Sequence, residues 1–478
     1  MLLLLGLAAG PAAGTTAAAP PPASHLPPAV QAAFATAKIP TGAVAVVVEK
    51  LDDPRRGFRR LAENAAQPMN PASVMKLFTT GAALDLLGPA RTWQTEVRVT
   101  QLPRGGVLKG SLYLKGSGDP KLNLAQFWQL LRELRQRGVR EIRGDLVLDR
   151  SLFELPPHDP AAFDGEGLRP YNVGADAALI GFQALRFLLI PDPAGKKVEV
   201  LQLTPDARLR VVNRLHQVGG ECRDWRDRIA PRISGSTLEL AGPFPTSCGE
   251  KPLNLSPLAA DAQVDGLFRA LWRELGGSLR GKVVGGRTPD DSLLLASHES
   301  PPLAELVRDI NKFSNNVMAR QLFLALSAET PPATYDKSTA RLRDWLQRRG
   351  IAAPELVIEN GAGLSRLDRA SADTLAALLR SIWHSPTMPE LVSSLPILGE
   401  DGTMKKRGNG NRGRAHLKTG YLDGVRALAG YVIDQRGERW LLVALVNHAN
   451  AMGAKEGLDR LVDWVIAADG SAASPAGQ

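Results

Sequence analysis

The apolar and polar positions divide the chain into alternating strand-like and helix-like stretches. Ala43–Val48 is an unbroken run of small and β-branched apolar residues, which predicts a buried strand. The pattern then becomes helical, because Asn70 is a good N-cap, Pro71 suits the first helical position, and Val74–Leu87 is nearly all apolar. Such a helix is buried on most of its faces, so each polar residue on it requires an explanation.

The middle of the chain follows a different pattern. Apolar and polar residues first alternate around one amphipathic stretch, which predicts a hairpin at Trp93–Thr100 and Gly110–Lys115, a helix at Leu124–Arg137 and a strand at Ile142–Leu148. Residues 180–260 are strand-like and rich in proline, and they share no clear pattern with their flanks. We therefore expect a separate small β module in that segment.

Helical periodicity returns in Ala262–Leu275 and in Pro302–Leu326. A hairpin of apolar strands, Ala427–Ile433 and Trp440–Val446, then precedes a final helix at Lys455–Ile466. The start of the chain thus predicts a strand and a helix, and the end predicts a hairpin and a helix. The segment between them is rich in predicted strands.

Length and composition narrow the class of protein. A chain of 478 residues suggests about three domains, and 44% hydrophobic with 22% charged residues excludes disorder of the whole chain. The net charge of +9 suits an anionic partner such as nucleic acid, a cell-wall polymer or a membrane surface. Basic runs such as Lys405–Arg407 lack interleaved aromatic residues, so we expect no nucleic-acid binding.

Two signals for cofactors or metals are weak. Gly408–Gly413 fits the spacing of a dinucleotide-binding loop, but no strand precedes it and no helix follows it. The seven histidines are scattered and none is paired at zinc-ligand spacing. We therefore expect no cofactor and no metal.

The N-terminus predicts export. Met1–Gly10 is an apolar block as long as the core of a signal peptide, small residues follow it, and Pro20–Pro28 predicts an extended linker. We assign residues 1–28 to a signal peptide and Pro-rich linker and expect the protein in the periplasm, where peripheral association with the envelope is compatible with its charge. No later apolar run reaches the length of about 18 residues that a transmembrane helix needs, so no membrane anchor is expected in the mature form.

The two cysteines, Cys222 and Cys248, are too few for a disulfide scaffold. Export would permit a disulfide between them, which would stabilise the fold by about 3 kcal/mol through its effect on the unfolded chain. Two free buried thiols are the alternative.

Ser73 and Lys76 are the first candidates for chemistry. They lie three residues apart at the start of the predicted helix, so their side chains share one face. A serine hydroxyl becomes a good nucleophile when a base takes its proton, and an apolar environment lowers the pKa of a lysine enough for that task. The N–H groups at a helix start can also stabilise an oxyanion.

Two further polar clusters occur later in the chain. Ser314 and Asn316 interrupt the apolar periodicity of a helical stretch, where a surface loop between two helices is the alternative explanation. Lys418-Thr419-Gly420 ends a short strand, on which Lys418 and Gly420 share a face; a solvated edge-strand lysine is the alternative.

Together and in this order, the three motifs form the signature set of penicillin-binding proteins and serine β-lactamases. The chain further resembles the S13 peptidase family, the penicillin-binding protein 4 type of D-alanyl-D-alanine carboxypeptidases and endopeptidases, and the likeness spans about residues 30–467. Additional family-like segments are Gly116–Pro120, Asn360–Arg366, Leu395–Gly402 and Ala427–Gly430. The 241 positions from Ser73 to Ser314 are far more than a β-lactamase has, so the catalytic domain must contain an insertion.

The resemblance implies a role for each motif residue. Ser73 would be the acylated nucleophile and Lys76 its proton acceptor. Ser314 would relay protons toward the leaving amine, and Asn316 would hold both the substrate amide and Lys76. Asp119 would lie near the rim of the active site.

The resemblance also assigns roles to the third motif. Lys418 and Thr419 would bind the terminal carboxylate of the substrate, and Gly420 would admit the substrate beside the strand. The backbone N–H groups of Ser73 and Tyr421 would form the oxyanion hole. Tyr421 is bulkier than the small or polar residue usual at this position of the family, so we expect a narrower rim.

These observations predict an α/β (α+β) fold in which a penicillin-binding protein/serine β-lactamase-like catalytic domain, an antiparallel sheet flanked by helices, is split by a long inserted β-rich region of two modules. The expected parts are the catalytic domain at 29–92 and 290–467, an inserted α/β domain at 93–180 and 261–289, a small β module at 181–260, and a disordered tail at 468–478.

The expected activity is that of a secreted serine DD-peptidase. It would release terminal D-alanine from peptidoglycan muropeptides, open D-alanyl crosslinks, or both, and β-lactam antibiotics would acylate it. A β-lactamase and an inactive wall-binding scaffold are the competing hypotheses. The long insertion argues against the first, and the three intact motifs argue against the second.

Overall fold

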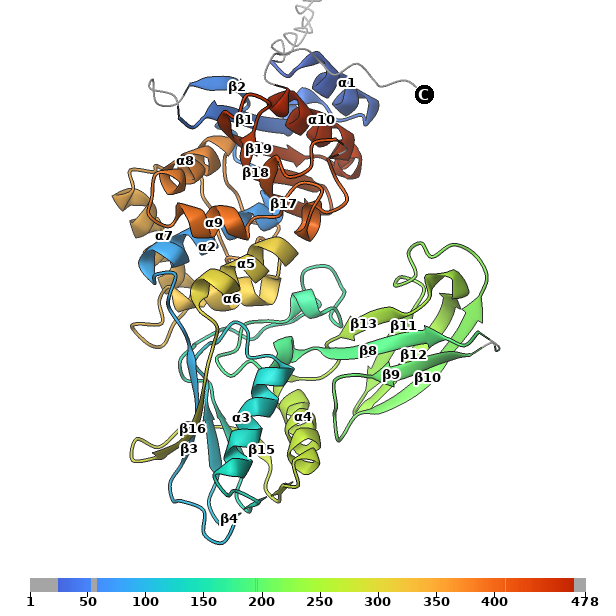
Figure 1. Ribbon diagram of the computed structural model, residues 1–478, viewed down its shortest axis with the longest axis vertical. Coiled ribbons are helices and arrows are strands. Elements are labelled where there is room, and N and C mark those ends of the chain that lie inside the picture. Colours follow the sequence, from blue (N-terminus) through green and yellow to red (C-terminus); the bar gives the residue numbers. More distant parts are fainter. Residues whose placement is uncertain (1–24, 53–57, 194, 196, 409, 468–478) are drawn as a thin grey trace, which may run out of the picture.

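The computed structural model describes residues 25–52, 58–193, 195, 197–408 and 410–467 (Figure 1). Residues 1–24 of the predicted signal peptide and Pro-rich linker (1–28) and the predicted tail at 468–478 lie outside the described residues.

A five-stranded antiparallel sheet lies at one end of the molecule (Figure 1). Its strands occur in the order β17-β18-β19-β1-β2. The bounds are β1 Val44–Lys50, β2 Arg59–Glu63, β17 Ala415–Leu422, β18 Val425–Ile433 and β19 Arg439–Asn447. The first strand pairs along its whole length with the last, with Val44 opposite Val446. Both ends of the chain therefore build one sheet, and the predicted apolar strands are confirmed.

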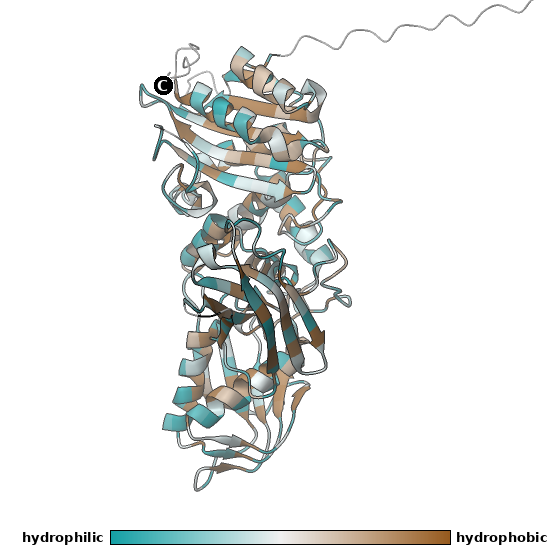
Figure 2. Cartoon of the chain, turned by 90° about the vertical axis from the view of Figure 1, so that its right-hand side faces the viewer, coloured by the Kyte–Doolittle hydropathy of each residue, from teal (hydrophilic) through white to brown (hydrophobic). Residues whose placement is uncertain are grey.

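Helices cover both faces of this sheet because its strands are apolar on both sides. Val44, Val46 and Val48 pack against α1 (Pro28–Thr36) and α10 (Lys455–Ile466), which lie side by side. The alternate residues Ala45 and Val47 belong to a second cluster that contains the remaining helices of this part. Figure 2 shows hydrophobic residues on the strands and hydrophilic residues on outward-facing sides of helices.

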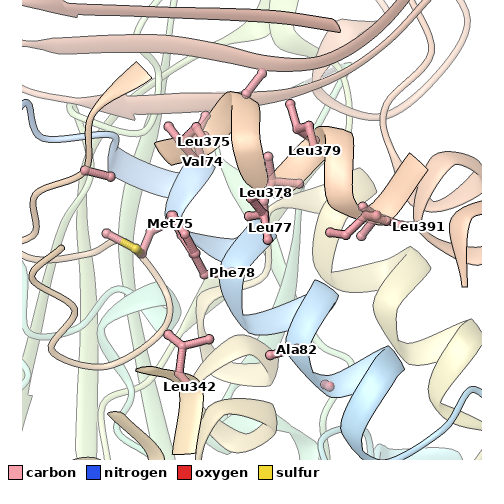
Figure 3. Packing of buried hydrophobic residues seen from close by; sticks show 14 of the residues in the cluster. Val74, Met75, Leu77, Phe78, Ala82, Leu342, Leu375, Leu378, Leu379 and Leu391 are labelled. Carbon is pink, nitrogen blue, oxygen red and sulfur yellow. The ribbon is translucent and has the colours of Figure 1, made fainter. Parts of the chain in front are cut away.

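The apolar cluster on the second face contains residues of six helices. They are α2 (Lys76–Leu86), α5 (Leu303–Phe313), α6 (Asn316–Ala325), α7 (Tyr335–Arg348), α8 (Ala372–Trp383) and α9 (Met388–Ser394). As the sequence predicts, α2 is buried over most of its surface. Leu77 and Phe78 pack between Leu342 of α7 and Leu378 of α8 (Figure 3).

The start of α2 differs from the prediction. A 3₁₀ turn at Ala72–Met75 precedes the helix, and the backbone of Ala72 has the unusual φ of +47°. Asn70 is therefore not the N-cap of α2. Its Oδ1 accepts a 2.8 Å hydrogen bond from Ala72 N, and its Nδ2 donates a 2.8 Å bond to the carbonyl of Ser365. Asn70 thus fixes the tight turn that presents Ser73.

The predicted helical stretch from Pro302 to Leu326 is two helices. α5 ends at Phe313, Ser314 takes a left-handed conformation with φ +55°, and Asn315 caps α6 by accepting a 3.1 Å hydrogen bond from Met318 N. Ser314 therefore lies at the corner between the helices, as the polar interruption in the sequence indicates.

The segment between β2 and α5 contains the inserted region. Its main sheet has the order β15-β7-β5-β3-β16 and packs against α3 and α4. The bounds are β3 Gln94–Val99, β5 Leu112–Lys115, α3 Leu124–Gln136, β7 Leu146–Asp149, α4 Ala260–Glu274, β15 Val283–Gly285 and β16 Leu293–Glu299. A minor sheet contains β4 Val107–Leu108, β6 Glu141–Ile142 and β14 Ser278–Leu279. The predicted strand at 142–148 is therefore divided between β6 and β7.

A small all-β part projects from the side of the inserted region (Figure 1). It consists of two three-stranded sheets, β13-β8-β9 and β10-β12-β11, around a shared apolar core. The bounds are β8 Leu185–Pro191, β9 Val198–Gln202, β10 Arg210–Val218, β11 Ala230–Ser234, β12 Thr237–Pro245 and β13 Lys251–Leu255. Cys222 and Cys248 form a disulfide here, so they are not two free thiols.

Separate clusters of buried residues occupy the catalytic part, the inserted α/β part and the small β part. These separate clusters support the predicted boundaries between the parts, near residues 92, 180, 260 and 289. The exact boundaries stay a prediction. Of the helices in the described ranges, none combines the length and apolarity required to cross a membrane.

Candidate active site

Three segments that are distant in the sequence meet where the 72–75 turn, the α5–α6 corner and strand β17 come together. Lys76 Nζ lies 3.0 Å from Ser73 Oγ and 2.6 Å from Asn316 Oδ1. Lys418 Nζ lies 2.9 Å from Ser314 Oγ. The candidates from all three motifs thus form one connected group.

Lys76 has a third partner, the carbonyl oxygen of Ala362, at 2.5 Å from Nζ. A neutral amine has two N–H donors and one lone pair. If Asn316 Oδ1 and the Ala362 carbonyl accept the two hydrogens, the lone pair faces the hydroxyl of Ser73. The geometry therefore suits transfer of the Ser73 proton to Lys76.

The surroundings of Lys76 favour its neutral form. Its side chain is fully buried, and burial lowers its pKa well below the usual value. The positive charges of Lys418 and Arg320 lower this pKa further, whereas the carboxylate of Asp368 raises it.

Lys418 is also fully buried, and burial lowers its pKa to about 7. Its Nζ donates to the carbonyl of Thr419 at 2.8 Å in addition to Ser314 Oγ. The hydroxyl of Thr419 donates to Thr403 Oγ1 at 2.8 Å. A buried ammonium with hydroxyl groups beside it can hold a small carboxylate.

Asn316 joins the first two motifs. Its Oδ1 accepts from Lys76, and its Nδ2 is 3.4 Å from the carbonyl oxygen of Tyr171 in the inserted region. Arg320, one turn further along α6, donates to the same Tyr171 carbonyl at 3.1 Å and to the carbonyl of Val173. These contacts fix the inserted region against the catalytic helices.

Two glycines let the backbone segments approach Ser73. A Cβ on Gly420 would lie 2.5 Å from the carbonyl oxygen of Pro71, and a Cβ on Gly363 would lie 2.0 Å from that of Ala72. Gly363 also has φ +72°, which favours glycine. The sequence-based reason for Gly420 was access for the substrate; the contact with Pro71 shows that glycine is required there for packing.

The direction of the peptide groups in β17 follows from its neighbours. β17 is the edge strand of the sheet, and Leu417 N donates to the carbonyl of Pro396 outside the sheet at 2.9 Å. Alternate residues of a strand point their peptide groups the same way, so the N–H of Tyr421 also faces away from β18. The 72–75 turn contacts both β17 and β18.

The ring of Tyr421 is 60% exposed beside the site. The Arg426 guanidinium carbon lies 3.4 Å from the ring centroid, and the Tyr421 hydroxyl is 3.0 Å from Met452 Sδ. These two contacts hold the large side chain at the rim.

Asp119 is placed elsewhere. Its side chain is buried in the inserted region, where Oδ1 accepts from Lys121 N at 2.8 Å and Oδ2 lies 3.8 Å from His298 Nε2. Burial raises its pKa to about 6. No contact joins Asp119 to the catalytic group within the described residues, and burial leaves it no access to a substrate. The position near the rim of the active site that the resemblance implies for Asp119 stays a prediction.

The sequence reasoning gave no role to several residues around the site. Ala362 belongs to the Asn360–Arg366 segment, yet it acts through its carbonyl oxygen, which no side-chain pattern indicates. Asp368 is buried, and its pKa is raised to about 7 mainly by burial. The sequence signal that could have indicated Asp368 is its position two residues after the Asn360–Arg366 segment. No group of three or more His, Cys, Asp or Glu side chains in the described ranges is arranged to hold a metal ion.

The antiparallel sheet with its helices and the Ser-Lys group define a penicillin-recognising serine enzyme fold. Residues 27–467 match the model of the D-Ala-D-Ala carboxypeptidase 3 (S13) family, and the chain belongs to this family. It is thus a D-Ala-D-Ala carboxypeptidase of the S13 type, as the motifs indicate.

Similar proteins are consistent with this membership. A D-alanyl-D-alanine carboxypeptidase of Actinomadura sp. (strain R39) is 30% identical over 431 residues, 86% of this chain and 78% of the relative. D-alanyl-D-alanine carboxypeptidase DacB of Haemophilus influenzae is 28% identical over 80% of this chain and 81% of the relative. The crystal structure of penicillin-binding protein 4 from Haemophilus influenzae superposes with a TM-score of 0.74, covering 91% of this chain and 99% of that chain at 26% identity.

Proposed function

We propose that this carboxypeptidase acts through an acyl-enzyme on Ser73. The observation that carries the proposal is the contact of Ser73 Oγ with Lys76 Nζ, whose other two close partners are carbonyl oxygens. Burial lowers the pKa of Lys76 and so favours the neutral form that can accept the proton.

The reaction starts with binding of a peptide that ends in D-Ala-D-Ala. Its terminal carboxylate lies against Lys418 and Thr419, and Asn316 Nδ2 donates to the substrate amide. Ser73 Oγ then attacks the carbonyl carbon of the penultimate D-alanine while its proton passes to Lys76. The N–H groups of Ser73 and Tyr421 stabilise the oxyanion.

Collapse of the tetrahedral intermediate breaks the amide bond. The proton that Lys76 accepted reaches the leaving amine through Ser314, so D-alanine departs as a neutral amine. Water then attacks the Ser73 ester, which releases the shortened peptide and restores the hydroxyl. The same steps open a D-alanyl crosslink when the leaving amine belongs to a second stem peptide.

Labelling with a fluorescent penicillin tests the nucleophile. A structure of penicillin-binding protein 4 from Haemophilus influenzae contains a β-lactam, and we expect β-lactams to acylate Ser73 in this chain. The label should disappear in Ser73→Ala and persist in Ser393→Ala, which changes an exposed serine on α9. Unchanged labelling of Ser73→Ala would refute the assignment.

Turnover distinguishes an enzyme from a scaffold with the same fold. Purified protein should release D-alanine from a D-Ala-D-Ala pentapeptide and cleave crosslinked muropeptide dimers. Turnover of neither substrate would favour a wall-binding scaffold, and rapid hydrolysis of penicillin without peptide turnover would favour a β-lactamase.

We also propose export to the periplasm. The Cys222–Cys248 disulfide supports this, because oxidised cysteine pairs persist outside the reducing cytosol. N-terminal sequencing of protein recovered from the periplasmic fraction should find a chain that starts after the apolar block. Recovery of full-length protein from the cytosol alone would contradict the proposal.

A further inference from the structure

A groove of about 540 Å³ continues from the active site into the inserted region. Ser314 and Asn316 form its catalytic end. Arg186 on β8 and Gln263 on α4 belong to its lining in the inserted part. The volume is in the range of specific ligand sites, about 300–1,000 Å³. A single leaving D-alanine would fill little of this space.

The lining combines neutral amides, two exposed aromatic rings and one positive charge. Phe313 is 70% exposed and Tyr171 40%, although both side chains are large and hydrophobic. Arg186 is the one charged side chain among the described lining residues, and its exposed guanidinium forms no ion pair with them. The groove therefore suits a ligand with apolar segments and a carboxylate.

Gln263 provides an independent indication of a ligand. The side chain is only 2% exposed, and its Nε2 has no hydrogen-bond partner among the residues that the structure describes. A buried donor without a partner is unfavourable, and a ligand oxygen that accepts from it would offset this cost. A peptide carbonyl or carboxylate oxygen has the required chemistry.

The catalytic end of the groove indicates which part of a substrate enters it. In the proposed mechanism Ser314 delivers the proton to the leaving amine, and its Oγ contacts Lys418, the carboxylate-binding residue. Ser314 lies at the catalytic end of the groove together with Asn316. Under the proposed function the groove therefore extends on the side of the leaving group.

We infer that the groove binds the leaving stem peptide of a D-alanyl crosslink. Arg186 pairs with a free carboxylate of that peptide, Gln263 Nε2 donates to one of its oxygens, and Phe313 and Tyr171 contact its apolar parts. The bond that breaks is the same D-alanyl amide, and the amine that leaves belongs to the peptide in the groove. The inference rests on the proposed function and makes the inserted region part of the substrate site for crosslinked muropeptides.

Two variants test the groove by comparing two substrates. Arg186→Glu reverses its exposed charge, and Phe313→Ala removes an exposed ring, so neither disturbs the core. Because a hydrogen bond to a charged group contributes about 1.5–3 kcal/mol, kcat/KM for a crosslinked dimer should fall roughly tenfold or more in Arg186→Glu. For a D-Ala-D-Ala pentapeptide, whose leaving group is alanine alone, kcat/KM should stay within about twofold of the parent enzyme.

Arg210→Glu is the matched control, since Arg210 is exposed on β10 of the same small β part and does not line the groove. It should leave both substrates unaffected. Equal losses for pentapeptide and dimer in Arg186→Glu would place the retained acyl portion in the groove and overturn the inference. Unchanged cleavage of the dimer in both groove variants would also overturn the inference. The same holds if the parent enzyme cleaves the pentapeptide and not the dimer. Failure of the proposed function has a different signature, because the parent enzyme would then cleave neither substrate.

Discussion

Lys418 Nζ donates a 2.9 Å hydrogen bond to Ser314 Oγ, which joins the edge strand β17 to the corner between α5 and α6. Since burial lowers the pKa of Lys418 to about 7, its charge changes in the working pH range. Carboxylate binding requires the protonated form, which dominates below that pKa. The value of kcat/KM for the pentapeptide should therefore decline above about pH 7.

A bound carboxylate stabilises the ammonium of Lys418 and raises its pKa in the complex. The alkaline decline of kcat should accordingly occur at a higher pH than that of kcat/KM. Parallel pH profiles of both parameters check this relationship. A kcat/KM that stays constant from pH 6 to about pH 9 would contradict the role of Lys418.

Gly363→Ala should impair acylation because of where its Cβ would lie. The added carbon would come within 2.0 Å of the Ala72 carbonyl oxygen and displace the turn that presents Ser73. Misplacement of a reacting atom by about 1 Å can reduce the rate about 100-fold, so a loss of that order in the rate of penicillin acylation is expected.

Gly350→Ala is the control that distinguishes the effect of the close contact with Ala72 from the effect of backbone strain at a positive φ. Gly350 has a similar φ of +69°, but a Cβ added there would meet no other part of the described chain within 4 Å. This variant should lose some stability and retain the acylation rate. If both substitutions slow acylation equally, the close approach to Ala72 is not the cause.

Asp368→Asn should stabilise the protein in alkaline solution. Burial raises the pKa of this carboxyl from 3.8 to about 7, so the folded state favours its protonated form. The resulting stabilisation is present below the unfolded pKa and is lost as pH rises through about 7. Removing the ionisable group should therefore stabilise the protein by about 3 kcal/mol more at pH 8.5 than at pH 5.

Thermal unfolding of the two forms at both pH values measures this difference. Asp344→Asn serves as the control because Asp344 is half exposed on α7, and its effect should be small at either pH. A gain for Asp368→Asn that is the same at pH 5 and pH 8.5 would rule out titration as its origin.

Removing the disulfide should destabilise the small β part without abolishing acylation of Ser73. Cys222 and Cys248 close a loop with a sequence separation of 26, for which the chain-entropy model gives about 3 kcal/mol. The double variant Cys222→Ser, Cys248→Ser should show earlier proteolysis within residues 181–260 and still bind fluorescent penicillin at Ser73. Loss of penicillin binding would show that this part supports the catalytic group directly.

The sequence predicted most elements because their patterns are local. The final helix at Lys455–Ile466 is as predicted, and the polar break at Ser314 marks a true corner. The predicted cap at Asn70 was wrong because its Oδ1 accepts from Ala72 N in the turn that precedes the helix, while its Nδ2 donates to the carbonyl of Ser365, 295 residues later. Such long-range contacts leave no trace in the spacing of neighbouring residues.

The candidate site shows the same limit. Motif spacing singled out the side chains that meet at Ser73, but it gave no role to the Ala362 carbonyl, which is a backbone group. It also assigned Gly420 to substrate access, whereas the contact with Pro71 depends on how two distant segments pack. Backbone contributions of this kind depend on the tertiary structure.

The pairing of β1 with β19 imposes an order on the assembly of the enzyme. A growing chain that stops before Arg439 has made Ser73, Lys76 and the inserted region, yet one edge of β1 has no partner strand. β17 also depends on β18 for its place in the sheet, so Lys418 cannot reach Ser314 until the last strands arrive. The contact between Lys418 and Ser314 therefore forms only when synthesis of the chain is nearly complete.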